Sequence, residues 1–372
     1  MNIIDILKRI FQPQAKRNKT DKGLAKDSFE LAKSTIEIKV NTEIHPIYKK
    51  ELPNGLLPGE VVLLDWLKGH EEPEDFPKYF SYQYGIDAWS SYKRLLLEGY
   101  IAHATPEESL ATLTVVDLKE ILRSKNLKVT GKKAELIERI KENFTSEEIA
   151  AFIKKHVLTL TDKGKQVLEE YYYIPAAHWK SSKDGVYNVA SAIQYVNQHK
   201  GRPKNEEISW NLLQQSFKKN LKQGDYGIAR NVVLSMAEQL KKERKFVDAL
   251  DFYIRVFIMD LSGLSNNRIL DEPESVMLAP GIIREIKKFS ENLQKEELNM
   301  IFSKSWSEIR PLLPFHYFDE QTCFQCLLAI FNDDDDFERY IRSKLKKAFK
   351  KIDRNILKKH GIRILREWLY SQ

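Results

Sequence analysis

The chain has 372 residues, which is too long for one compact core of ordinary size and predicts two or three folding units. Hydrophobic residues make up 42%, charged residues make up 30%, and the mean hydropathy is −0.47. This composition excludes membrane proteins and fully disordered chains. No run of 18 apolar residues occurs, so no membrane-spanning helix is predicted.

The formal net charge of +7 is concentrated near the C-terminus. Residues 337–372 carry twelve Lys and Arg against three Asp and Glu, a local charge of about +9, so the remainder sums to about −2. The two cysteines, Cys323 and Cys326, are too few for a disulfide framework and indicate a reducing compartment. We therefore expect a cytoplasmic protein.

The first 50 residues are expected to form a basic, amphipathic and flexible arm. Residues 1–11 have an amphipathic helical pattern rather than the apolar core of a secretory signal. Such a helix docks on the protein's own core or on a partner, or lies on a membrane surface. Residues 35–40 add a weak strand signal to a polar, basic stretch.

The next segment predicts helices followed by two strands. An apolar helix is expected over residues 60–67, and a further helix that opens near Asp87 ends at Gly99. Residues 100–104 and 157–161 are strand candidates, and the second leads into a helix over residues 165–172. One face of the helix after Asp87 carries Trp89, Tyr92, Leu95 and Leu96.

The sequence Glu-Gly-Tyr-Ile at 98–101 together with Leu-Thr-Leu-Thr-Asp-Lys-Gly at 158–164 resembles the wing of bacterial winged-helix proteins. The resemblance implies a winged-helix-like domain formed by residues 51–105 and 156–178, interrupted by an insertion over residues 106–155. Trp89, Lys93 and Arg94 would then lie on a recognition helix that reaches DNA. In the alternative, this is an ordinary helical domain in which Trp89 is core and the two cations form a solvated face.

The insertion contains the most specific pattern of the chain. Leucines recur along residues 113–122, and residues 127–140 read Leu-Lys-Val-Thr-Gly-Lys-Lys-Ala-Glu-Leu-Ile-Glu-Arg-Ile. This resembles the SAP family, small helix-extended-helix units that bind DNA, and some of whose members bind RNA or proteins instead. Two short helices are expected to close over a shared core. Its residues are predicted to be Val115, Leu118, Leu122, Leu127, Val129, Leu136, Ile137, Ile140 and Phe144.

The second helix of this unit starts with lysines, although the helix dipole favours negative charge there. A DNA phosphate would resolve the conflict by accepting the free N–H groups of residues 131–134 and pairing with the two lysines. The predicted DNA-binding residues are Lys119, Arg123, Lys125, Lys128, Gly131, Lys132, Lys133 and Ala134, with Lys93 and Arg94 outside the insertion. Phosphate contacts of this kind predict duplex binding with weak sequence selectivity. The alternative is a small packing module without a ligand.

Residues 205–310 predict a helical interaction domain that recruits a protein partner. Residues 245–260 resemble the second helix of a tetratricopeptide repeat, with Phe246, Ala249, Tyr253 and Val256 at that family's aromatic and small positions. True repeats would recur after about 34 residues, and this sequence has room for one at most. A plain helical bundle is the alternative.

Residues 311–372 predict further helices, of which the last is basic on most of its surface. Its cations are Arg342, Lys346, Lys347, Lys350, Lys351, Arg354, Lys358, Lys359, Arg363 and Arg366. This helix is expected to be a second nucleic-acid contact, to neutralise the acidic run at residues 333–336, or to dock on an acidic partner.

No cofactor, metal site or catalytic motif is expected. Cys323 and Cys326 have metal-ligand spacing and His316 is nearby, but no second cysteine pair exists and the segment is apolar, so buried thiols are expected. The acidic run at residues 333–336 is interpreted as a charged loop rather than a nuclease site.

Taken together, the sequence predicts a mainly α protein. A SAP unit is inserted in a winged-helix-like domain, and a solenoid-like or bundle domain of helices follows. The combination resembles SAP-containing proteins of bacteria and their phages. We expect a non-enzymatic, nucleoid-associated DNA-binding protein; a nuclease and a protein scaffold with basic docking surfaces are the alternatives.

Overall fold

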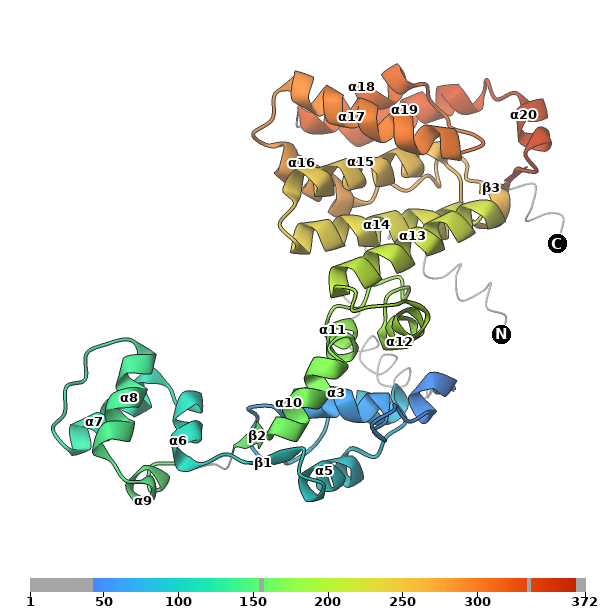
Figure 1. The fold of residues 1–372 in the computed structure, drawn as a ribbon. Coiled ribbons are helices and arrows are strands. Elements are labelled where there is room, and N and C mark those ends of the chain that lie inside the picture. The colour runs from blue at the N-terminus through green and yellow to red at the C-terminus, as the bar shows by residue number, and fades with distance from the viewer. Residues whose placement is uncertain (1–42, 154–156, 333–335, 366–372) are drawn as a thin grey trace, which may run out of the picture. The chain divides into compact units, whose positions relative to one another are not determined.

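The computed structural model describes residues 43–153, 157–332 and 336–365 (Figure 1). The chain divides into two units, residues 1–43 and 44–372, and nearly all of the first lies outside the described residues. The helix expected over residues 1–11 and the strand expected over residues 35–40 lie outside them as well. None of the described helices is long and apolar enough to cross a membrane.

The second unit begins with helices whose first turns are capped. α3 (Pro58–Leu67) starts at a proline, and the Glu60 carboxylate accepts the Leu57 N–H at 2.9 Å. α5 (Ala88–Leu97) starts after Asp87, whose carboxylate accepts a backbone N–H of the first turn at 2.7 Å. Both predicted helices are confirmed. The other helices before residue 204, outside the insertion, are η1 (Pro46–Lys49), α4 (Tyr79–Tyr82), α10 (Asp162–Glu170), α11 (Tyr173–Trp179) and α12 (Val189–Gln198).

The two strands predicted on either side of the insertion pair with each other. β1 (Ile101–His103) and β2 (Leu158–Leu160) are antiparallel, with Ile101 opposite Leu160. A single antiparallel bridge between Glu71 and Val157 extends this small sheet toward the segment between α3 and α4. Along the chain, the elements therefore follow the order α3, the bridging residue Glu71, α4, α5 and the strand pair β1 and β2.

The turn from β2 into α10 depends on two residues, Thr161 and Gly164. The Thr161 hydroxyl donates to the Gly99 carbonyl at 2.7 Å and accepts the Gly164 N–H at 3.2 Å, so it links the two strands and caps the helix. Gly164 lies directly over the Tyr100 carbonyl oxygen, which would be 2.1 Å from a Cβ atom. Only glycine fits this close approach of the backbones.

The insertion between β1 and β2 forms its own small core. It consists of α6 (Pro106–Ser109), η2 (Leu110–Thr112), α7 (Val115–Ser124), α8 (Lys133–Asn143) and α9 (Ser146–Ala150). Capping boxes are present at Thr105 and Thr145, and α6 packs against α9. Its buried core residues are Leu110, Leu118, Ile121, Leu122, Leu136, Ile140, Phe144 and Ile149.

Helices make up most of the chain after residue 204. They are α13 (Asn205–Gln223), α14 (Tyr226–Lys242), α15 (Phe246–Ser262), α16 (Pro280–Ser290), α17 (Lys295–Ile309), α18 (Glu320–Phe331), α19 (Phe337–Phe349) and α20 (Arg354–Lys359). α15 is nearly all buried and packs on α14, α16 and α17 (Figure 1). A short parallel pair, β3 (Ile269–Leu270) with β4 (Arg363–Ile364), ties the end of this region to its middle.

Side-chain caps set two helix boundaries in this region, and one predicted helix is wrong in extent. α16 ends at Ser290, and α17 begins at Lys295 because the Glu297 carboxylate accepts the Gln294 N–H at 2.8 Å. The long basic helix is two helices, since Asp353 accepts the Asn355 N–H at 2.9 Å and starts α20 after a break. The molecule is mainly helical, as predicted.

The tetratricopeptide resemblance of α15 is matched only in part. Ala249, Tyr253 and Val256 are buried as that pattern requires. Phe246 is half exposed and its ring stacks on Phe289 at 5.5 Å, so it does not fill the core position expected for it.

Candidate nucleic-acid interface

α7 and α8 pack against each other through apolar residues spaced three and four apart. Leu118, Ile121 and Leu122 supply the buried side of α7. The prediction that Val115 belongs to this core is wrong, because its side chain is 39% exposed; Ile121, which the prediction left out, is buried. α7 ends where Asn126 adopts a φ of 57°, which lets the Leu127 N–H return to the Leu122 carbonyl at 2.9 Å.

The start of α8 has a geometry that the charge pattern alone did not reveal. The Glu135 carboxylate accepts the N–H of Lys132, the N-cap residue, at 3.2 Å. Gly131 has a φ of 136°, and a Cβ atom there would lie 2.5 Å from that carboxylate. The expectation that all N–H groups of residues 131–134 are free is therefore wrong for Lys132. The Lys-x-x-Glu spacing of a capping box was the available signal.

Two first-turn N–H groups of α8 remain open. Those of Lys133 and Ala134 have no acceptor among the described residues, as expected for the start of a helix. Both residues are exposed. The positive end of the helix dipole therefore faces solvent beside the Lys132 side chain.

Four of the predicted cations have side chains that form no hydrogen bond or ion pair within the described parts of the chain. Lys119 and Arg123 lie one turn apart on α7, and Lys128 and Lys132 lie on the connector that leads into α8. Arg123, Lys128 and Lys132 are exposed and Lys119 is half-buried. Their charges are available to a ligand.

Two other predicted cations serve the unit itself. The Lys133 ammonium group donates to the Ala111 carbonyl at 2.7 Å. Lys125 donates to the Asn143 carbonyl at 2.8 Å, pairs with Glu148 at 2.6 Å and lies 4.2 Å from the centre of the Phe144 ring. Lys125 thus joins α7 to α8 and α9, and its predicted contact with DNA does not follow from this geometry.

Arg139 holds the connector between α7 and α8 and does not itself offer a free charge. Its guanidinium group donates to the carbonyl oxygens of Lys128 and Thr130, at 2.7 and 3.2 Å. These bonds hold the extended connector in one conformation. Because the connector carries Lys128 and leads to Lys132, Arg139 is a positioning residue for the free cations.

These two helices, their connector and the glycine before α8 are the features of one known family. Residues 109–145 match the model of the SAP domain. The chain therefore contains a SAP domain, which indicates nucleic-acid binding in general. No curated protein and no solved structure matches the chain.

Outside the SAP domain, the cations predicted on α5 separate into two kinds. Lys93 is exposed, and its ammonium group forms no hydrogen bond or ion pair among the described residues. Arg94 pairs with buried Glu60 at 3.1 Å and with Glu98 at 2.8 Å, and it donates to the Gly55 carbonyl at 3.1 Å. These contacts hold α5 on α3, so Arg94 has a structural role that the prediction missed.

Trp89 on the same helix is neither free nor part of the core. Its side chain is 41% exposed, and its ring meets Phe76 edge to face at 4.9 Å.

Some cations of the basic C-terminal stretch also have partners within the protein. Arg342 donates to the Pro273 and Val276 carbonyls at 2.6 Å each, and Lys346 pairs with Glu274 at 3.2 Å. The remaining exposed lysines there are Lys347, Lys350, Lys351, Lys358 and Lys359. Arg366 lies outside the described residues.

The cysteine pair and its histidine are buried in the helical core. Burial raises the pKa of Cys326 to about 12 and that of Cys323 well above its ordinary value. The His316 ring donates from Nε2 to the Ile258 carbonyl at 2.9 Å and accepts the Phe318 N–H at Nδ1. Among the described residues, no three His, Cys, Asp or Glu side chains are arranged to hold a metal ion; residues 333–335 lie outside them.

Proposed function

We propose that this chain binds duplex DNA by its phosphate backbone, with the start of α8 as the central contact. The observation that carries the proposal is the combination at Lys132: an exposed ammonium group without a partner among the described residues, next to two open N–H groups of a helix start. Such a site binds a phosphate oxygen through both charge and hydrogen bonds.

The neighbouring cations widen this contact along a strand of DNA. Lys119, Arg123 and Lys128 are the other cationic side chains of the SAP domain that have no partner in the described structure. With about four phosphates neutralised, affinity is expected to fall roughly a hundredfold between 50 and 200 mM salt. Contacts of this kind position a protein without reading bases, so the sequence selectivity is weak.

The domain around β1 and β2 is proposed to be winged-helix-like and to add a second contact through Lys93. The order of its elements supports this, since three helices precede a strand pair and the Glu71–Val157 bridge adds a third segment to the small sheet. The exposed lysines of α19 and α20 are proposed as an auxiliary contact.

The helices over residues 205–310 are proposed to recruit a protein partner, and the chain is proposed to be non-enzymatic. A nuclease would instead cleave plasmid DNA when a divalent metal is added. A scaffold would retain its protein partners after nuclease treatment and would not shift DNA.

The test is an electrophoretic mobility shift with the full chain and a 30-base-pair duplex at 50 and 200 mM salt. The Lys128→Ala/Lys132→Ala variant should bind about tenfold more weakly at the lower salt, and the slope of log affinity against log salt should fall by about two. Lys218→Ala/Lys219→Ala is the matched control, because both lysines are exposed on α13 outside the SAP domain. Equal binding by the two variants would sink the proposal.

A further inference from the structure

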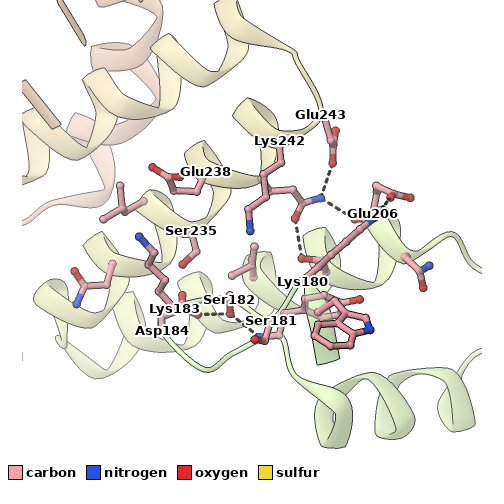
Figure 2. Close-up of a pocket in the computed structure, with 18 residues that line it drawn as sticks. Lys180, Ser181, Ser182, Lys183, Asp184, Glu206, Ser235, Glu238, Lys242 and Glu243 are labelled. Carbon is pink, nitrogen blue, oxygen red and sulfur yellow. Dashed lines mark hydrogen bonds and ion pairs between the residues drawn. The ribbon is translucent and has the colours of Figure 1, made fainter. Parts of the chain in front are cut away.

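A cavity of about 690 Å³ opens between the loop after α11 and helices α13 and α14 (Figure 2). Its wall is formed by residues 179–187 of the loop, the first half of α13 and the second half of α14. The volume is in the range of sites that hold small organic ligands. None of the residues proposed to contact DNA lines it.

The cavity wall contains buried polar atoms that lack a partner. The Tyr187 hydroxyl, Asp184 Oδ2 and Asn205 Oδ1 form no hydrogen bond among the described residues, and Tyr187 is only 2% exposed. The other Asp184 oxygen is occupied, since Oδ1 accepts the Val186 N–H at 3.0 Å. Buried polar atoms without partners lower stability, so three at one cavity indicate a ligand that supplies hydrogen bonds.

Three acidic side chains around the cavity have partners in the described structure. Glu206 pairs with Lys180 at 3.4 Å, and Glu243 pairs with Lys245 at 2.7 Å. Glu238 accepts the hydroxyl of Tyr253 at 2.5 Å and has Lys241 at 3.9 Å.

Two lysines of the wall differ from these. Lys183 on the loop and Lys242 on α14 have no partner among the described residues, and their ammonium ends point into the space between the two elements (Figure 2). Their two ammonium groups and the carboxylate of Asp184 are the charges of the wall that form no ion pair among the described residues. A ligand that fits this pattern carries a negative group for the two ammonium groups and hydrogen-bond donors for the unpaired oxygens.

An aromatic side chain is fixed at the rim. The Trp179 indole N–H donates to the Asp65 carboxylate at 2.9 Å, which holds the ring, and yet 58% of the side chain is exposed. A held and exposed indole is a stacking surface for a planar ring.

We propose that this cavity binds a nucleotide. The base stacks on Trp179, its amino groups donate to the oxygens of Asp184 and Asn205, and the phosphate pairs with Lys183 and Lys242. Burial raises the pKa of the Tyr187 phenol, so its hydroxyl stays protonated and can donate to the ligand.

The test is calorimetric titration of the full chain, without DNA, with AMP, GMP, CMP and UMP, and in parallel with adenosine and with inorganic phosphate. At least one nucleotide should bind more tightly than both adenosine and phosphate. For that nucleotide, Lys183→Ala/Lys242→Ala should weaken binding by about tenfold or more, because two charge-assisted hydrogen bonds are lost. Lys218→Ala/Lys219→Ala should bind like the parent.

Tyr187→Phe separates a binding role from a purely structural one. Without ligand, this variant should melt at the same or a higher temperature than the parent, because an unpaired buried hydroxyl is removed. Its rise in melting temperature on addition of the nucleotide should be smaller than the parent's. The proposal is overturned if no nucleotide binds at millimolar concentration, if phosphate alone binds as tightly, or if the double lysine variant binds unchanged.

Discussion

The ammonium group of Lys133 donates a hydrogen bond to the Ala111 carbonyl oxygen at 2.7 Å, whereas its neighbour Lys132 has no partner among the described residues. The two lysines are adjacent in sequence and yet differ in role. Lys133→Ala should lower the free energy of unfolding by about 0.5–1 kcal/mol, because one hydrogen bond is lost at an exposed site. Lys132→Ala should leave stability unchanged and weaken DNA binding more than Lys133→Ala does.

Urea unfolding and the mobility shift measured on the same two proteins check this division of roles. Lys141→Ala is a suitable control, since Lys141 is exposed on α8 and pairs with Glu138 at 3.2 Å. A Lys132→Ala protein that is less stable than the parent and binds DNA equally well would reverse the assignment.

Gly164→Ala tests the turn between β2 and α10. A Cβ atom there would lie 2.1 Å from the Tyr100 carbonyl oxygen, so β1 and α10 would have to separate. We expect a loss of more than about 2 kcal/mol in the free energy of unfolding, measured in urea. Gly281→Ala is the control: nothing lies within 4 Å of its Cβ position in α16, and alanine favours a helix there. Equal stability of the two variants would contradict the close approach.

Sequence periodicity predicted most of the fold because the signals involved are local. The helices from α13 to α15 follow apolar spacing, and the strands β1 and β2 pair although more than 50 residues separate them in the chain. That pairing was expected from a resemblance to a wing, and in the structure Thr161 caps α10 while Gly164 allows the close approach to the Tyr100 carbonyl. The break between α19 and α20 was not predicted, since basic residues continue through it and only Asp353 marks the new start.

The candidate site was predictable in position and less so in detail. A list of cations does not show which of them meets an acceptor once the chain folds. Arg94 finds the buried Glu60 carboxylate 34 residues away, and Lys125 finds Glu148 on α9. Both acceptors come from elements whose position depends on tertiary packing, so charge and spacing could not separate these residues from Lys128 and Lys132.

His316 makes the stability of the helical core depend on pH. Burial, together with the charge of Arg310, lowers its pKa from 6.5 to about 4. Between these two values the unfolded chain binds a proton that the folded chain does not, so stability falls as the pH falls. The loss should reach about 3 kcal/mol at pH 4.

Urea unfolding of the parent and of His316→Gln at several pH values between 4 and 7 measures this contribution. Other groups titrate equally in both proteins, so the difference between the two curves isolates the histidine. The difference should be flat above pH 6.5 and should change below it, in the direction that favours the variant. Parallel curves would show that the pKa of the ring is the same in the folded and the unfolded chain.

Removal of the SAP domain should leave the surrounding domain folded. The Ala104 N–H donates to the Val157 carbonyl at 2.7 Å, so the two ends of the insertion are adjacent. A two-residue Asn-Gly link in place of residues 105–156 matches the turn that antiparallel strands prefer. Because the insertion has a core of its own, this deletion removes none of the buried residues around α3.

The shortened chain is expected to melt cooperatively by circular dichroism and to lose most of its affinity for duplex DNA at 50 mM salt. Cooperative melting with full DNA affinity would indicate that Lys93 or the basic residues of α19 and α20 make the main contact with DNA. Loss of cooperative melting would mean that the SAP domain is needed to hold β1 against β2. A second deletion with a longer glycine-rich link distinguishes that requirement from strain in the two-residue turn, because strain alone is relieved by added length.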